Sequence, residues 1–506
     1  MVRPPNRSGS LDYLFTAAQC RELDRIAIED RGIPGFVLMQ RAGRVAFAEL
    51  LQRWPSVASI SVCCGKGNNA GDGYVVAGLA RELGLAVQLI QLGDPHMLVG
   101  DAARARDWAM ARGLAQTDGP SAQLRGEVIV DALLGTGFIG GLRPAYTEMV
   151  GAINASQAGV LALDIPTGVV ADTGAVGGDA VRADVTVSFV GRKIGLYTGP
   201  GKSWAGDVIF DDLSMPADVL HQVSGCPLLR YSQQAPMPRR DPNAYKQNQG
   251  HVLVVGGDRG MGGAPIMAGE AALRMGAGLV TLMTRAEHRS AALTRRPEIM
   301  VVDADDAAAR LAVLARSSVL VVGPGLGRSA WGLELLRECL AAAKPMVLDA
   351  DGLHGFALLN PSSTPDLSGS APIIATPHPG EAAALLGISN QEVQTDRLRA
   401  AVALAQRVAG VAVLKGAGTV IADADRGVSG VCAHGNPGMA SAGMGDVLSG
   451  VIGGLLAQGL SPLRSAQLGT CLHSAAADRA AEQGDQRSLL ATDLFSPMIE
   501  LLRRSQ

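Results

Sequence analysis

Short apolar runs alternate with helical patterns along most of this chain, and this alternation constrains the fold more than any other feature. Strands that alternate with helices form βαβ units, which pair as parallel sheets. In the first half we predict strands at 59–64, 86–92, 127–134, 159–165, 184–190 and 207–210, with helices at 36–53 and 70–83. In the second half we predict strands at 251–255, 278–283, 318–322, 345–348, 373–375 and 411–414, with helices at 265–275, 331–343 and 396–409. Near-continuous apolar strands such as 319–322 suit a sheet that is covered on both faces.

The stretch 216–249 interrupts this alternation. It is rich in proline and includes Arg239-Arg240-Asp241-Pro242, so we interpret it as a linker. A chain of 506 residues also exceeds one ordinary domain. We therefore predict an α/β protein of two three-layer domains, at 12–218 and 226–503. The two halves share no motif, which indicates a fusion rather than a duplication.

Composition and charge exclude several classes of protein. The chain is 47% hydrophobic but only 4% aromatic, which favours close helix–sheet packing over an all-β fold. A net charge of −3 provides no basic field for nucleic acid or an anionic membrane. The seven cysteines form no C-x-x-C pattern, which is typical of buried free thiols in a reducing compartment. No run reaches the roughly 18 apolar residues of a membrane span, and residues 1–8 do not resemble a signal peptide. We expect a cytoplasmic protein.

Three polar, glycine-rich segments follow predicted strands in the first half, where parallel sheets bind their ligands. The segment 61–73 contains Gly-Lys-Gly-Asn-Asn-Ala-Gly-Asp-Gly, whose backbone N–H groups can cradle a phosphate. The segments 131–141 and 163–168 place Asp131 and Asp164 at neighbouring strand ends. One carboxylate could bind a cation while the other moves protons. The alternative for Asp164 is a purely structural Asx turn.

The second half contains Gly443-Met444-Gly445-Asp446 directly before an apolar helical segment. Glycines before a helix leave backbone N–H groups unblocked, and with the helix dipole they form an anion site. An aspartate there has the wrong charge to bind an anion but suits a base beside a phosphate. The motif therefore indicates phosphoryl transfer to a hydroxyl, and a glycine-rich helix cap is the alternative.

Further glycine or polar segments follow other predicted strands of the second half, at 256–264, 323–327, 348–353, 376–381 and 415–419. Lys415-Gly-Ala-Gly-Thr419 could hold a nucleotide phosphate. His378 lies between two prolines and is rigidly held, so a structural hydrogen bond remains the alternative to a role in proton transfer. These segments predict one ligand site at the carboxyl edge of a second sheet.

The segments 61–73, 131–141, 163–168 and 191–197 together resemble the NAD(P)H-hydrate epimerase domain. The resemblance implies a Rossmann-like fold that interconverts the R and S forms of hydrated NADH or NADPH. It implies that the substrate contacts Asn68, Asn69, Ala70, Gly71, Asp72, Gly135, Thr136, Gly137, Phe138, Ile139, Gly140, Gly141 and Asp164. It also implies a potassium ion on Asn69, Asp131 and Thr167, with Asp164 as our choice for proton transfer.

The second-half segments occur in the order of the ribokinase-like NAD(P)H-hydrate dehydratases, over roughly 250–500. This resemblance implies that ADP, with Mg²⁺, phosphorylates the C6 hydroxyl of the S hydrate, which then loses phosphate to restore NAD(P)H and leaves AMP. The implied hydrate contacts are Ala264, Gly327, His378 and Asp446, with Asp446 as the base. The implied nucleotide contacts are Lys415, Gly416, Ala417, Gly418, Thr419 and Gly445.

The combined prediction is a bifunctional repair enzyme for damaged nicotinamide cofactors, an isomerase fused to a lyase. Its partners would be NAD(P)HX, ADP and AMP, and we expect a homo-oligomer. One alternative is a kinase of a small hydroxylated metabolite with a fused regulatory domain, against which the segments 378–381 and 435–440 argue. The other is a nucleotide-binding sensor without activity, against which the presence of Asp131, Asp164 and Asp446 argues.

Overall fold

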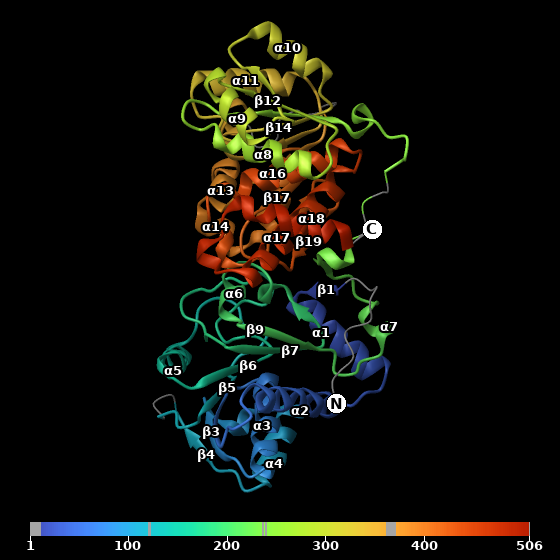
Figure 1. Ribbon diagram of the computed structural model, residues 1–506. Helices are drawn as coiled ribbons and strands as arrows, with labels where there is room; N and C mark the ends of the chain where they lie inside the picture. Colours follow the sequence, from blue (N-terminus) through green and yellow to red (C-terminus); the bar gives the residue numbers. More distant parts are fainter. Residues whose placement is uncertain (1–11, 120–122, 235–236, 238–239, 361–370, 505–506) are drawn as a thin grey trace. The chain divides into compact units, whose positions relative to one another are not determined.

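A computed structural model describes residues 12–119, 123–234, 237, 240–360 and 371–504 of the chain. The chain divides into two compact units, Tyr13–Cys226 and one that begins at Pro227 (Figure 1). Each unit is built around its own run of parallel strands with helices on both faces, so the predicted α/β class is confirmed. No helix among the described residues is long and apolar enough to cross a membrane.

The N-terminal unit contains a seven-stranded sheet in the order β4-β3-β2-β5-β6-β7-β9, and every neighbouring pair is parallel. Two further strands, β1 and β8, pair with each other in parallel. The strands are β1 (Asp12–Phe15), β2 (Ser59–Cys64), β3 (Ala86–Gln91), β4 (Gln116–Asp118), β5 (Val128–Ala132), β6 (Gly159–Leu163), β7 (Val185–Phe189), β8 (Arg192–Lys193) and β9 (Asp207–Asp211). The helices are α1 (Ala17–Arg25), α2 (Gly35–Arg53), α3 (Asn68–Glu82), α4 (Gly100–Met110), α5 (Pro144–Ala155), α6 (Gly199–Trp204) and α7 (Ala217–Leu220).

Alternate residues of this sheet belong to two separate hydrophobic clusters, one on each face. Val128 and Val130 of β5 pack with α2, α3 and α4 on one face. Ile129 packs with Met149 and Ile153 of α5 on the other. Successive side chains of a strand point to opposite faces, so a continuous apolar run is what a doubly covered sheet requires.

The C-terminal unit has the strand order β13-β12-β11-β14-β15-β16-β17-β18-β19-β10. Its strands are parallel from β13 to β17, and β18 and β19 then form an antiparallel hairpin against β17. The strands are β10 (Cys226–Leu229), β11 (His251–Val255), β12 (Leu279–Thr284), β13 (Met300–Asp303), β14 (Val319–Val322), β15 (Met346–Leu348), β16 (Ile373–Ala375), β17 (Val411–Leu414), β18 (Val420–Asp423) and β19 (Gly427–Cys432).

Helices cover this second sheet. They are α8 (Gly263–Arg274), α9 (Arg289–Arg295), α10 (Ala307–Arg316), α11 (Ala330–Ala341), α12 (Ala350–Leu359), α13 (Pro379–Leu386), α14 (Asn390–Thr395), α15 (Arg397–Arg407), α16 (Met444–Ala457), α17 (Pro462–Gln483) and α18 (Phe495–Arg504). The main core lies between the strands and α8, α16, α17 and α18. Helices α8 and α16 pack backbone to backbone, since a Cβ on Gly450 would lie 2.1 Å from the carbonyl oxygen of Ala268. This close packing fixes where α16 begins, and the Gly443–Asp446 segment with it.

The stretch 216–249 was interpreted as a linker along its whole length, and the structure corrects this for part of it. Residues 226–229 form β10, which pairs in parallel with β19, and Leu228 and Leu229 are buried. The prolines in the surrounding sequence concealed this strand, because its pairing partner lies about two hundred positions away in the chain. The prediction of free thiols is confirmed for all seven cysteines, of which only Cys226 is not fully buried.

Candidate active sites

The N-terminal unit has a cavity of about 810 Å³ at the carboxyl ends of its strands. Most of the predicted substrate contacts line it, namely Asn68, Asn69, Asp72, Gly135, Thr136, Gly137, Phe138, Ile139, Gly141 and Asp164. Ala70, Gly71 and Gly140 do not line it. Ala70 faces the core from α3, and a Cβ on Gly71 would collide with Met39. The glycines of this helix therefore allow close packing as well as access to a ligand.

The three predicted potassium ligands meet around Leu134. The Asn69 amide nitrogen donates to the Leu134 carbonyl at 3.0 Å, and the Leu134 N–H donates to Thr167 Oγ1 at 3.0 Å. Thr167 donates to both Asp131 oxygens, through Oγ1 at 2.8 Å and through its backbone N–H at 2.8 Å. Asn69, Asp131 and Thr167 are all buried. Side chains from three segments are thus held in one cluster by hydrogen bonds.

The chemistry of this cluster fits a weakly hydrated cation. Asn69 Oδ1 is buried and has no hydrogen-bond partner in the part of the chain described, which is costly for a carbonyl oxygen unless a ligand compensates it. Burial raises the pKa of Asp131 to about 6, although its hydrogen bonds to Thr167 and Leu133 oppose the shift. A cation beside it would offset this cost. Oxygen donors alone, with one carboxylate, suit potassium better than Mg²⁺, which demands a tight octahedron.

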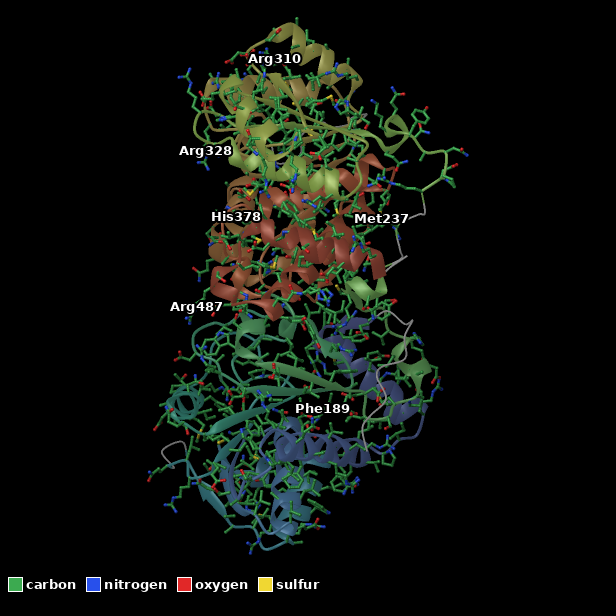
Figure 2. All side chains as sticks on the ribbon, viewed as in Figure 1. Phe189, Met237, Arg310, Arg328, His378 and Arg487 are labelled. Carbon is green, nitrogen blue, oxygen red and sulfur yellow. The ribbon has the colours of Figure 1, made fainter. Side chains whose placement is uncertain are left out.

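Asp164 follows β6 with a φ of +66°, a left-handed conformation that is uncommon outside glycine. Its carboxylate forms an ion pair with Lys193 and accepts the Phe189 N–H at 3.2 Å. The Lys193 ammonium also donates to the Phe189 carbonyl at 2.6 Å. Figure 2 labels Phe189 at the end of β7. The strained backbone directs Asp164 into the cavity, which Lys193 also lines.

The C-terminal site begins with two loops joined by backbone hydrogen bonds. The Gly257 N–H donates to Pro324 at 3.1 Å, and the Asp258 N–H donates to Gly325 at 2.7 Å. The Gly327 N–H donates to the Asp351 carboxylate at 3.0 Å. A Cβ on Gly325 would lie 3.4 Å from the Ala264 Cβ. The loops that carry the predicted hydrate contacts Ala264 and Gly327 are therefore neighbours.

Lys415 begins the predicted nucleotide-binding segment 415–419 (the nucleotide segment), and its side chain reaches the Gly443–Asp446 segment. Its ammonium lies 2.9 Å from Asp349 Oδ1 and 3.9 Å from Glu381 Oε2. A Cβ on Gly445 would lie only 3.1 Å from the same ammonium. The side chains of Asp349 and Glu381 thus aim Lys415 at the start of α16. Neither carboxylate was predicted as a site residue, although both lie in strand-end segments that the sequence singled out.

Asp446 lies in the first turn of α16. The residue that precedes this helix is Gly443, which has a left-handed conformation with a φ of +88°. Burial raises the pKa of Asp446 to about 7, the carboxylate of Asp349 adds to the shift, and Lys415 opposes it. A carboxyl poised near neutrality is suited to act as a general base. The first-turn N–H groups beside it have no acceptors within the helix and can bind an anion.

His378 caps α13 (Figure 2). Its Nδ1 accepts the N–H groups of Gly380 at 3.0 Å and Glu381 at 3.3 Å, and the Glu381 carboxylate accepts the His378 N–H at 2.8 Å. The His378 ring therefore has a structural role as the cap of α13, which was the alternative that the sequence left open. Nε2 lies 3.4 Å from Glu381 Oε1, and the side chain is 57% exposed, so it can still donate to a ligand.

Arg397 holds the start of the nucleotide segment by hydrogen bonds to its backbone. This side chain is almost fully buried and donates to the carbonyls of Leu414 and Lys415, each at 3.1 Å. A Cβ on Gly416 would lie 3.0 Å from the guanidinium, and Gly416 has a φ of +137°. Sequence reasoning placed Arg397 on a predicted helix and missed this contact, because an arginine at the start of a helix is usually solvated.

Comparison with known proteins agrees with this geometry. Residues 252–500 match the family model described as NAD(P)H-hydrate dehydratase, and residues 35–195 match the model of the YjeF-related protein N-terminus. A solved ADP/ATP-dependent NAD(P)H-hydrate dehydratase from Bacillus subtilis, co-crystallised with ATP and Mg²⁺, is 27% identical with a TM-score of 0.50. The similarity extends over 56% of this chain and 99% of the Bacillus subtilis chain.

The fold and the two sites define a two-domain α/β enzyme with a ribokinase-like C-terminal unit. A bifunctional NAD(P)H-hydrate repair enzyme of Coxiella burnetii is 49% identical over 96% of this chain and 98% of its own length. The protein of the same name from Escherichia coli is 42% identical over 96% and 93%. The chain belongs to the family of bifunctional NAD(P)H-hydrate repair enzymes, which confirms the resemblance recognised in the sequence.

Proposed function

We propose that this protein repairs hydrated NADH and NADPH in two steps, with an epimerase at 12–218 and an ADP-dependent dehydratase at 226–503. The observation that carries the proposal is the placement of Asp446, whose carboxyl is poised near neutrality beside the anion-binding start of α16 and Lys415. Membership of the family supports both activities. The two compact units and the two matched models support the division into domains.

In the dehydratase, Asp446 takes the proton of the C6 hydroxyl as that oxygen attacks the terminal phosphorus of ADP. AMP leaves, and Lys415 with the N–H groups at the start of α16 stabilises the transferred phosphoryl group. Loss of phosphate from C6 and of a proton from C5 then restores the ring double bond. Asp349 and Glu381 keep Lys415 aimed at the phosphate throughout.

A Mg²⁺ ion would enter this site with the nucleotide. Among the described residues there is no cluster of three or more His, Cys, Asp or Glu that could hold a metal. In proteins Mg²⁺ is commonly bound by substrate phosphates and one or two carboxylates. Asp349 and Glu381, the carboxylates beside Lys415, would be the protein ligands. The ion would neutralise charge on the phosphates.

In the epimerase, Asp164 takes part in proton transfer at C6. The substrate is held by the residues of 68–72 and 135–141 that line the cavity, without Ala70, Gly71 and Gly140. Asn69, Asp131 and Thr167 would hold a potassium ion, whose charge would attract the anionic substrate to this edge of the sheet. The unpartnered Asn69 Oδ1 supports this assignment. The homo-oligomeric state and the cytoplasmic location stay predictions from the sequence.

Single substitutions in the full-length chain test the two activities. The R and S epimers of NADHX are supplied separately with ADP and Mg²⁺, and NADH absorbance is followed. We expect the Asp446→Asn variant to interconvert the epimers without forming NADH. We expect the Asp164→Asn variant to repair S at the wild-type rate and R only at the spontaneous rate of epimerisation. Mixing the variants should restore repair of both.

The decisive measurement is the rate at which the R epimer is repaired. If the Asp164→Asn variant repairs R and S equally fast, Asp164 does not serve an epimerase. If, instead, the wild-type enzyme itself repairs R no faster than R converts spontaneously, the N-terminal unit has no epimerase activity at all.

A further inference from the structure

The N-terminal cavity has more acidic groups around Lys193 than this one cation can neutralise. Asp24 of α1, Asp72 of α3 and Asp164 after β6 all line the cavity with Lys193. Lys193 is 2% exposed and pairs with Asp164. In the described part of the chain, neither Asp24 nor Asp72 forms a side-chain hydrogen bond or ion pair. Since like charges disfavour one another's ionisation, part of this group must retain its protons near neutral pH.

The environment distinguishes Asp24 from Asp72. Burial raises the pKa of Asp24 to about 6, with Lys193 opposing the shift and Asp164 adding to it. Burial, followed by the charge of Asp164, raises the pKa of Asp72 much further. Burial would lower the pKa of Lys193, but the charge and hydrogen bond of Asp164, together with the charge of Asp24, outweigh it and raise that pKa. Lys193 therefore stays cationic, and Asp24 is the free carboxyl that can both give and regain a proton near neutrality.

Other titratable groups in the cavity wall do not compete for this role. The thiol of Cys20, one turn before Asp24, has its pKa raised to about 11, chiefly by burial, and so stays protonated. The remaining charged or titratable groups that line the cavity are Arg21 on the same helix, Lys66, Asp101, Arg143 and Tyr146. Only Lys193 and Asp164 act appreciably on Asp24.

We propose that Asp24 is the proton donor of the epimerase and that Asp164, held in place by Lys193, is its proton acceptor. This inference rests on the proposed epimerase activity. Asp24 and Asp164 touch the substrate as catalytic residues, whereas Lys193 acts through Asp164 and is a positioning residue. The two carboxyls come from different elements, α1 and the end of β6, and both line the cavity.

The chemical step balances with these two groups alone. Asp24 gives its proton to the C6 hydroxyl, the C6–O bond breaks, and water leaves as the ring nitrogen lone pair forms an N1=C6 double bond. Water then adds to the other face of C6, and its proton goes to the Asp164 carboxylate. The proton returns from Asp164 to Asp24, within the cluster or through solvent, before the next turnover in the same direction.

The test uses the full-length protein with the R epimer, ADP, Mg²⁺ and an excess of the Asp164→Asn variant, which supplies dehydratase but no epimerase. NADH absorbance then reports the rate of epimerisation, after subtraction of the spontaneous rate. We expect Asp24→Asn to lower kcat by about 10²–10⁴, the usual loss for a general acid, with KM little changed. Glu22→Gln, two positions away on the exposed face of α1, is the matched control and should leave the rate unchanged.

The pH profile identifies the donor. Because Asp24 acts in its protonated form, wild-type kcat/KM for R should fall as pH rises through about 6. Asp24→Asn should abolish this alkaline limb. Lys193→Met should lower kcat and move the limb to higher pH, since Lys193 opposes protonation of Asp24. A merely structural role of Lys193 would leave the position of the limb unchanged.

Three results would overturn the proposal. Asp24→Asn with a rate within threefold of wild type would exclude Asp24 as the donor. A large loss in Asp72→Asn beside a small one in Asp24→Asn would assign the proton to Asp72 instead. An alkaline limb that persists in Asp24→Asn would assign the titration to another group. If wild type itself does not accelerate conversion of R, the proposed epimerase activity fails, and that result is distinct from all three.

Discussion

The dehydratase should depend on pH through Asp446 in a way that its neighbours control. Asp446 must be ionised to take a proton, and burial together with Asp349 raises its pKa to about 7. Activity should therefore rise with pH through about 7. One pH unit below this value about a tenth of the enzyme is active, and two units below about a hundredth. An ordinary aspartate would instead be fully active from about pH 5 upwards.

Two substitutions should move this acid limb in opposite directions. Asp349→Asn removes the largest like charge acting on Asp446, so the limb should move to lower pH. Lys415→Met removes the opposing positive charge, so the limb should move to higher pH. Asp446→Asn removes the base, and we expect kcat to fall by about 10²–10⁴, equivalent to about 3–5 kcal/mol of transition-state stabilisation.

The assay follows NADH absorbance from the S epimer at saturating ADP and Mg²⁺ between pH 5 and 9. Binding of ADP to the Asp446→Asn variant should persist and serves as the control for folding. A wild-type rate that is already maximal at pH 5 would refute the role of burial in raising the pKa. A rate within a few-fold of wild type in the Asp446→Asn variant would refute the assignment of the base.

The geometry also predicts the effects of four further substitutions. Asp131→Ala should abolish potassium binding, so that thallium, a heavy substitute for potassium, gives an anomalous signal at this cluster in crystals of the wild type but not of the variant. Arg397→Met should loosen the nucleotide segment, raising KM for ADP more than it lowers kcat, and equal effects on both would contradict a positioning role. Gly450→Ala should destabilise the C-terminal unit by about 1–3 kcal/mol because its Cβ meets the α8 backbone at 2.1 Å. Gly151→Ala in α5, where a Cβ meets nothing within 4 Å, should instead raise the melting temperature slightly.

The sequence was sufficient for the strands whose apolar runs are continuous. The predicted bounds of β2 (Ser59–Cys64) and β11 (His251–Val255) agree with the structure, because a strand covered on both faces must be apolar at every position. The grouping of Asn69, Asp131 and Thr167 came from the family resemblance, and the structure places the three side chains in one cluster. Residues at the carboxyl ends of adjacent parallel strands share one edge of the sheet, which is the physical reason for their proximity.

Tertiary structure alone decided the features that depend on long-range pairing or burial. The strand β10 lies in a proline-rich segment and pairs with β19, where Leu228 lies opposite Val431. Asp24 reaches Asp164 and Lys193 across more than 130 positions of chain, and its carboxyl acquires a raised pKa only inside the cavity. Local sequence carries no record of such an environment, since the electrostatic field at a side chain is the sum over everything that surrounds it in the folded state.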